Sequence, residues 1–361
     1  MVPGTGRGWV ESVSGEEVRM RGLRIFAVLA VGAMSMAAGG AAADWKAEPA
    51  IQALYAAAKK EGAVSIWGTT AGAVDWIPKA FAETFPGIDV QAHGENEITT
   101  KAISEARGGR HTVDVFQHSL TGTMPLVQRG IIAKVDWPKL GIPENQTTFD
   151  GHSLLAYNIA YTIIFNKDKI GSLPVPTKWE QLRDPVYKGK LVSSIFLLPR
   201  LSGGLSVVWG MEKTEAFLRD LTGKNEIMVT RAPRESIVLG GERLFSVGEI
   251  DSQVLRWQRS GLSLEMVTPE PVVFGQFVAS VMDKAPNPNA ARLLARWLVS
   301  PEGKAGQKQF TFAVDYGPDS DNPIARKVHA KQMPAAFDTP EAMAEREKAT
   351  GSFGRIVAGQ R

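Results

Sequence analysis

The chain has 361 residues, of which 44% are hydrophobic and 22% are charged, so it can form a large core and we expect two lobes. Its 41 basic and 38 acidic residues leave a formal charge of only +3, which offers no electrostatic argument for a nucleic-acid partner or an anionic membrane surface. It contains no cysteine, which excludes disulfides, thiolate metal sites and a cysteine nucleophile.

The N-terminal residues have the pattern of an export signal. Three arginines within residues 19–24 form a basic region, residues 25–38 form a short apolar run, and three alanines then match the A-x-A cleavage pattern. The apolar run is too short and too rich in Gly and Ala to span a membrane. We therefore predict a leader and signal peptide over residues 1–43, a start at Met1 or Met20, and a mature protein that is free in the periplasm.

Helices and strands alternate in the part that follows. Helices are predicted where apolar residues recur at helical spacing, and strands where short β-branched runs lie between Gly or Pro breaks. This alternation is typical of βαβ units and a mostly parallel sheet. The predicted helices are residues 50–60, 76–85 and 98–107, and the predicted strands are residues 64–67, 88–90 and 113–116.

A long run of β-branched and aromatic residues, 154–165, predicts a strand that passes from one lobe to the other. A second long strand, 272–282, is predicted as the return crossing. Between and after these two strands, we predict strands at 191–195, 229–230 and 263–267, a turn at 200–204, helices at 205–221, 252–259, 289–299 and 301–310, and a polar tail with helical pieces over 318–361.

Polar residues follow several of the predicted strands. Because the carboxyl ends of parallel strands meet at one edge of a sheet, we expect such residues to line a ligand cleft. These residues are Thr69, Thr70, Ser119, Arg231, Asp251 and Ser252.

Taken together, several segments resemble the periplasmic solute-binding proteins of ABC importers, in particular the ferric-iron-binding branch (extracellular solute-binding family 1). The resemblance covers nearly all of residues 62–310. The segments that carry it are Asp114-Val115-Phe116 with residues 126–132, Tyr157-Asn158 with Phe165-Asn166-Lys167, residues 179–191, Gly241-Glu242, and residues 287–303.

The resemblance implies an α/β, two-lobed periplasmic-binding-protein fold of type II, with mostly parallel sheets and a ligand cleft between the lobes. It places lobe 1 at residues 44–153 plus 268–317 and lobe 2 at residues 154–267 plus 318–361. It also implies a monomer without cofactor or catalytic activity. Such a protein closes around a small-molecule ligand and delivers it to an inner-membrane ABC permease.

In the iron-binding branch a His, a Glu and a Tyr-Tyr pair hold the metal. The corresponding positions here are Thr70, Ser119, Asp251 and Ser252. Three hydroxyl groups and one carboxylate are a poor set of ligands for a hard trivalent cation, which prefers anionic oxygen or imidazole ligands. We therefore expect no metal site.

The family also binds an anion at a Ser-Gly-small turn that precedes a helix, and Ser202-Gly203-Gly204 resembles that turn. The other interpretation is that Ser202 only caps its own helix. Arg231 stands where the family has an Asn in this anion site, and a guanidinium could hold a carboxylate or phosphonate through two hydrogen bonds. Otherwise Arg231 is solvated. Arg200 and Arg234 are further candidates of the same kind.

Two other residues have alternative roles. Asp251 either pairs with an ammonium group of the ligand or caps the helix 252–259, and Trp67 either stacks on the ligand or belongs to the core. The candidates predict a small organic anion or zwitterion: a carboxylate, an amino-acid-like or a phosphonate-like molecule. The alternatives are a ferric-iron protein that also uses a bound anion and, lastly, a periplasmic enzyme, for which Glu249 and Asp251 are the acid pair, although acids at this spacing are usually solvated.

Overall fold

The computed structural model describes residues 44–95, 97–318 and 320–359. The predicted leader and signal peptide over residues 1–43 lies outside the described residues. Within the described part, no helix combines the length and the apolar character that a membrane span requires.

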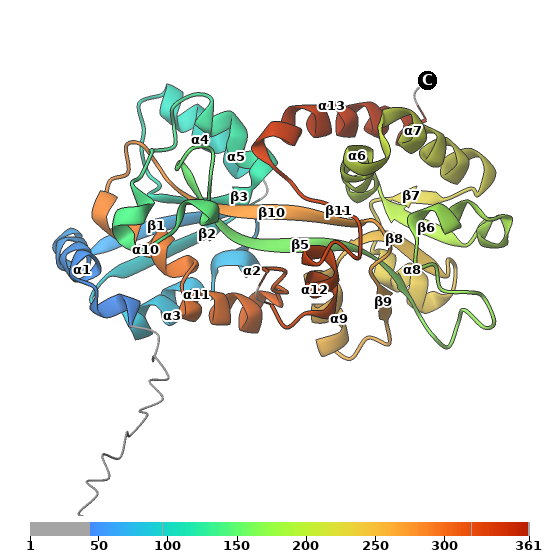
Figure 1. The fold of residues 1–361 in the computed structure, drawn as a ribbon, viewed down its shortest axis with the longest axis horizontal. Coiled ribbons are helices and arrows are strands. Elements are labelled where there is room, and N and C mark those ends of the chain that lie inside the picture. Colours follow the sequence, from blue (N-terminus) through green and yellow to red (C-terminus); the bar gives the residue numbers. More distant parts are fainter. Residues whose placement is uncertain (1–43, 96, 319, 360–361) are drawn as a thin grey trace, which may run out of the picture. The chain divides into compact units, whose positions relative to one another are not determined.

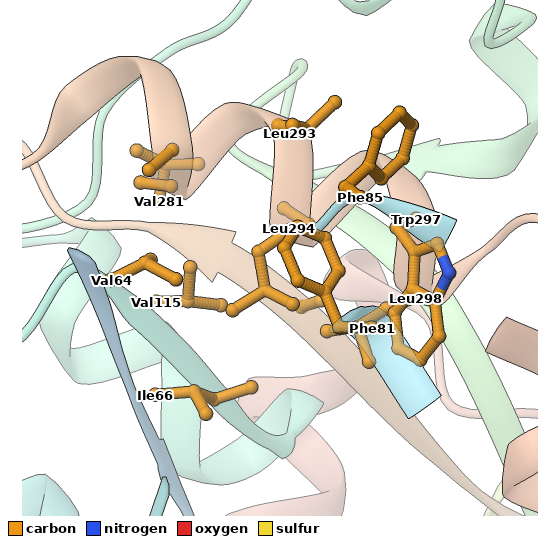
Figure 2. Close-up of a cluster of buried hydrophobic side chains, with 14 of the residues drawn as sticks. Val64, Ile66, Phe81, Phe85, Val115, Val281, Leu293, Leu294, Trp297 and Leu298 are labelled. Carbon is orange, nitrogen blue, oxygen red and sulfur yellow. The ribbon is translucent and has the colours of Figure 1, made fainter. Parts of the chain in front are cut away.

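The first lobe is built on three parallel strands in the order β2-β1-β3. Helices on both faces of these strands bury an apolar core, and Figure 2 shows part of it, where Val64 of β1 and Val115 of β3 approach Leu294. The ring of Trp297 meets that of Phe81 edge to face at 5.4 Å. The elements are α1 (Pro49–Glu61), β1 (Ala63–Gly68), α2 (Ala71–Val74), α3 (Ile77–Thr84), β2 (Asp89–Gly94), α4 (Ile98–Arg107), β3 (Val115–Ser119), α5 (Leu120–Val127), α10 (Pro288–Leu298) and α11 (Pro301–Gly306).

The second lobe repeats this plan with the parallel strands β7-β6-β8. Its core includes the fully buried rings of Trp179, Phe217 and Phe245. Its elements are β6 (Leu191–Ser194), α6 (Leu197–Trp209), α7 (Met211–Arg219), β7 (Met228–Thr230), α8 (Arg234–Gly240), β8 (Phe245–Ile250) and α9 (Asp251–Arg259).

Two long strands connect the lobes, as predicted (Figure 1). β5 (Ser153–Phe165) and β10 (Val272–Val281) pair with each other antiparallel; β10 also pairs with β3, and β5 with β8. Parallel strands within each lobe and antiparallel crossing strands between them confirm the predicted α/β fold class. The division of the lobes near residues 153 and 267 stays a prediction. Three short strands extend these two. β4 (Thr147–Thr148) and β9 (Glu265–Val267) both pair with β5, and β11 (Ala335–Ala336) pairs with β10.

The predicted polar tail forms two helices, α12 (Pro323–His329) and α13 (Pro340–Val357). Helix α13 contacts both lobes, because Met343 packs against Leu120 of α5 while Phe353 belongs to the core of the second lobe. Figure 1 shows α13 passing from the neighbourhood of α5 to that of α6 and α7. The tail is therefore part of the fold and touches both sides of the crossing.

The predicted turn at residues 200–204 is wrong, because these residues lie inside α6. The predicted helix 205–221 is divided by Gly210 into α6 and α7, followed by a π-helical turn at Asp220–Lys224. The predicted helix 301–310 is likewise α11 followed by a π-helical turn at Gln307–Thr311. Packing, described below, explains the first of these differences.

Candidate ligand-binding cleft

The carboxyl ends of the two parallel strand sets face each other along β5. Ser119 at the end of β3 is level with Phe277 of β10, which pairs with Tyr157 of β5. Ile250 at the end of β8 pairs with Tyr161 of β5. The two ends are therefore only four residues of β5 apart, about 13 Å for an extended strand. Loops from both lobes meet over this gap, which is where a ligand would touch both.

The first lobe contributes Thr69, Thr70 and Ser119 to this gap. Gly68 is in register with Gln117 across the parallel pair β1–β3, so the two threonines that follow are level with His118 and Ser119. Thr70 is exposed and makes no side-chain capping bond with α2. Ser119 caps α5, because its Oγ accepts a hydrogen bond of 3.2 Å from the backbone N of Gly122.

Trp67 belongs to the core rather than to the cleft. It is only 6% exposed and lies in a cluster with Phe116 and Ile98. The ammonium of Lys101 lies 4.4 Å from its ring centroid. The structure therefore favours the core interpretation of Trp67 over a stacking role on a ligand.

His118 is a half-buried residue that points to the same side of β3 as Phe116. The two rings stack at 5.7 Å, as strand alternation predicts. The backbone N of Ser119 donates to Nδ1 over 2.7 Å, which leaves the proton of the neutral ring on Nε2. Burial, and secondly the positive charge of Arg200, lowers the pKa of His118 to about 4. The charge of Arg200 that acts on this ring comes from the second lobe.

The second lobe places Phe196, Arg200 and Arg231 together at the start of α6. Phe196 is the residue before α6, and Arg200 follows it by four residues, so the two lie on one face of the helix. The guanidinium of Arg231, just after β7, lies 5.4 Å from the centroid of the Phe196 ring. Both arginines are exposed. They follow the carboxyl ends of β6 and β7, and these ends are level with each other because Ser194 pairs with Thr230.

The predicted anion turn Ser202-Gly203-Gly204 is wrong. All three residues are buried inside α6, and Ser202 Oγ donates to the carbonyl of Leu198 at 2.8 Å. Their backbone N–H groups belong to the helical ladder and cannot bind a ligand. A Cβ on Gly203 would overlap Thr350 of α13, and one on Gly204 would overlap Val273 of β10. The glycines therefore serve the close packing of α6 against α13 and β10.

Asp251 is bonded to the protein itself. It is 1% exposed, its Oδ2 accepts a hydrogen bond of 2.6 Å from the Tyr316 hydroxyl, and its Oδ1 accepts one of 2.7 Å from the backbone N of Ser252. It is the first residue of α9, and Ile250 rather than Asp251 is the N-cap. A role in binding a ligand ammonium therefore requires that this buried carboxylate become accessible to the ligand. Ser252 is half-buried beside it.

Arg234 and Glu249 form a buried pair, so neither of them is a free group of the cleft. Arg234 Nε and Nη2 lie 2.5 and 3.1 Å from the two carboxylate oxygens, and Ser246 Oγ donates to the same carboxylate at 2.6 Å. Glu249 is 1% exposed, which contradicts the expectation of a solvated acid pair with Asp251. This expectation failed because the partners come from residues that local spacing does not reveal.

Two hollows of the described surface lie away from these polar loops. One is lined by residues near 102–113 and 129–131 at the opposite end of β3, and another by the last turns of α9 with residues 308–322. Among the described residues, no group of three or more His, Asp or Glu side chains is placed to hold a metal ion. The polar loops over the gap remain the best candidate site, on their position at both carboxyl edges.

Phe196 was not identified from the sequence. Its only sequence signal is its place, directly after a strand and before a helix, where a polar capping residue is preferred. The influence of Arg200 on His118 joins two residues that are distant in sequence, so local spacing does not reveal it.

Comparison with known proteins supports the fold. Residues 114–195 match the family model described as bacterial extracellular solute-binding protein. No curated protein matches the chain. Solved structures share the fold over most of its length.

Iron-bound HitA from Pseudomonas aeruginosa has a TM-score of 0.65 and 16% identity over 82% of this chain and 99% of its own. The apo ferric ion-binding protein A of Pasteurella haemolytica has a TM-score of 0.68 and 16% identity, over 83% and 99% of the two chains. The substrate-binding protein of an ABC transporter from Agrobacterium tumefaciens has a TM-score of 0.66 and 14% identity, over 83% and 96%.

At these identities the likeness shows the fold. The predicted resemblance to the ferric-iron-binding branch is thus confirmed in the fold. The chain has the fold of the two-lobed periplasmic solute-binding proteins, and its residues 114–195 carry the sequence pattern of bacterial extracellular solute-binding proteins.

Proposed function

We propose that this protein is the periplasmic substrate-binding component of an ABC transporter and that it captures a small organic anion or zwitterion. The ligand class is a carboxylate, an amino-acid-like or a phosphonate-like molecule. The protein closes around the ligand and delivers it to an inner-membrane permease.

The observation that carries the proposal is the pair of arginines at the start of α6. The arginine ion pairs within the described residues involve positions 183, 219, 234, 326 and 346, so Arg200 and Arg231 keep their charges free. Phe196 makes no side-chain capping bond, so the first N–H groups of α6 add partial positive charge. The proposed anion subsite is therefore at the first turn of α6, ahead of the buried Ser202–Gly204 segment that the sequence predicted.

Polar groups on both lobes would allow a bound ligand to stabilise the closed state. A ligand that touches one lobe in the open state and both in the closed state favours closure by its additional contacts. Here Arg200 and Arg231 would hold the anion from the second lobe, while His118 Nε2–H, with Thr70 and Ser119, would donate from the first. Because His118 is neutral, it adds a hydrogen bond without a further full charge.

Ferric iron is the second candidate, because the chain shares its fold with two proteins described as iron-bound or ferric ion-binding. In this chain the matching positions, Thr70, Ser119, Asp251 and Ser252, offer one carboxylate, and it is occupied by Tyr316 and Ser252. Iron binding would thus have to use a single carboxylate that is buried and already hydrogen-bonded within the protein. The donor set favours the organic anion.

A thermal-shift screen with carboxylates, amino acids, phosphonates, sugars and ferric citrate tests the proposal on the mature chain. We expect an anion to raise the melting temperature, and Arg231→Gln to weaken its affinity at least about tenfold, since a charge-assisted hydrogen bond is lost. Arg219→Gln, a surface arginine paired with Glu215, is the matched control and should leave affinity unchanged. Stabilisation by ferric ion alone, with metal in the purified protein, would support the alternative.

A further inference from the structure

An exposed phenylalanine occupies an unusual place at the cleft. Phe196 is 56% exposed, and it is the N-cap residue of α6, without a side-chain capping bond. Ser, Thr, Asp and Asn are favoured at this position because their side chains satisfy the first N–H groups of the helix. A large apolar side chain there gives up that capping bond and exposes apolar surface to water. Both costs are offset if the ring meets an apolar part of a ligand.

The surroundings of the ring show which part of a ligand could reach it. Arg231 covers the ring at 5.4 Å, and Arg200 lies one helical turn further along the same helix face. A molecule whose acid group is held by these guanidinium groups must place the remainder of its structure beside Phe196. The neighbouring guanidinium planes also favour flat partners, since arginine stacks on aromatic faces.

Resting on the proposed function, we propose that Phe196 is a specificity-determining residue and that the ligand is an aromatic anion. The acid group binds Arg200 and Arg231, and the ring of the ligand packs against that of Phe196. Two aromatic rings gain a specific offset or edge-to-face contact beyond the burial of apolar area. An aliphatic anion of the same charge would make the ionic contacts and leave Phe196 in water.

The location of Phe196 supports a contact with the ligand rather than an exposed side chain without a function. Phe196 follows β6, and β6 runs parallel to β8, whose carboxyl end is four residues of β5 from that of β3. The ring therefore lies at the edge of the second lobe that faces His118. Val207 and Val208, the exposed apolar residues at the far end of α6, lie three turns away from this edge.

Paired probes isolate the contribution of the ring. Calorimetric titration of the mature protein with phenylphosphonate and with methylphosphonate compares two anions that share a head group. We expect phenylphosphonate to bind at least about tenfold more tightly, from ring burial and aromatic contact. Phe196→Ala should bring the ratio of the two affinities close to one, and Phe196→Trp should keep it. Val208→Ala, 40% exposed on the same helix, is the matched control and should keep the wild-type ratio.

The outcomes separate this inference from the function on which it rests. If both probes bind through Arg231 with equal affinity, or if Phe196→Ala leaves the ratio unchanged, the aromatic ligand class is wrong and the anion-binding function stands. If neither phosphonate binds, nor the carboxylate pair benzoate and acetate, nor any carboxylate, amino acid or phosphonate of the thermal-shift screen, both proposals are wrong. Circular dichroism of each variant shows that α6 remains folded.

Discussion

The hydroxyl of Tyr316 donates a hydrogen bond of 2.6 Å to Oδ2 of Asp251, and both residues are buried. This bond joins the segment before α12 to the first turn of α9. The carboxylate is therefore a structural group of the crossing region, although sequence position alone makes it a ligand candidate.

The stability of the protein should depend on pH through Asp251. Burial, opposed by the hydrogen bonds of Tyr316 and Ser252, raises the pKa of Asp251 from 3.8 to about 6. A folded-state pKa above the unfolded one gives stability that is complete below about pH 4 and is lost as pH rises through 6. The unfolding free energy of the wild type should therefore fall by up to about 3 kcal/mol between pH 4 and pH 7, relative to that of Asp251→Asn.

Urea unfolding of wild type and Asp251→Asn at both pH values measures this difference, with the exposed Asp283→Asn as control. An equal difference in unfolding free energy at pH 4 and pH 7 would show that Asp251 does not titrate in this range.

The two glycines inside α6 should not tolerate alanine. A Cβ on Gly204 would overlap Val273, and one on Gly203 would overlap Thr350, so each substitution overpacks the contact with β10 or α13. We expect a loss of about 1–3 kcal/mol in unfolding free energy for each variant. Gly351→Ala in α13, where a Cβ meets nothing within 4 Å, should instead gain about 0.5–1 kcal/mol from helix propensity. Chemical denaturation measures the unfolding free energy of each variant. Stabilisation by Gly204→Ala would refute the packing argument.

Arg234 and Arg231 should differ in what they control, although only two residues separate them. Arg234→Gln leaves the buried Glu249 without its charged partner and should lower the unfolding free energy by about 3–5 kcal/mol. Arg231→Gln should leave stability nearly unchanged and lower anion affinity. Denaturation and titration of both variants separate the roles; equal stability losses would mean that Arg231 is also structural.

His118 should stay neutral down to about pH 4, because burial and the charge of Arg200 both disfavour the imidazolium. Nitrogen-detected NMR of the ring should show the Nε2–H tautomer at pH 7, since Ser119 N donates to Nδ1. His118→Asn identifies the signal. Titration near pH 6.5 would contradict the buried, cation-facing position.

Much of the fold could be predicted because local patterns carry it. The alternation of strands and helices, the long strands β5 and β10 and the core face of α10 all follow from periodicity. Two segments that carry the family resemblance also meet in space, since Asp114 Oδ1 accepts a hydrogen bond of 2.6 Å from the backbone N of Asn287.

The site could be predicted only in part, because its details depend on distant partners. Gly203 and Gly204 suggest a turn by their propensity, and only their contacts with β10 and α13, which are distant in sequence, explain their place in a helix. Asp251 suggests a helix cap until Tyr316 is seen beside it. The polar turns at Thr70, Ser119 and Arg231 were expected from strand ends, and strand register places them at the facing edges.

The central claim is that two free arginines of the second lobe, Arg200 in the first turns of α6 and Arg231 just after β7, bind an anion between the lobes. Calorimetric titration of phenylphosphonate into wild type and into the Arg200→Gln/Arg231→Gln double variant tests it most directly. Two charge-assisted hydrogen-bonding groups are removed, so we expect affinity to fall at least about 100-fold while the double variant remains folded. Equal affinity of the two proteins would contradict the account.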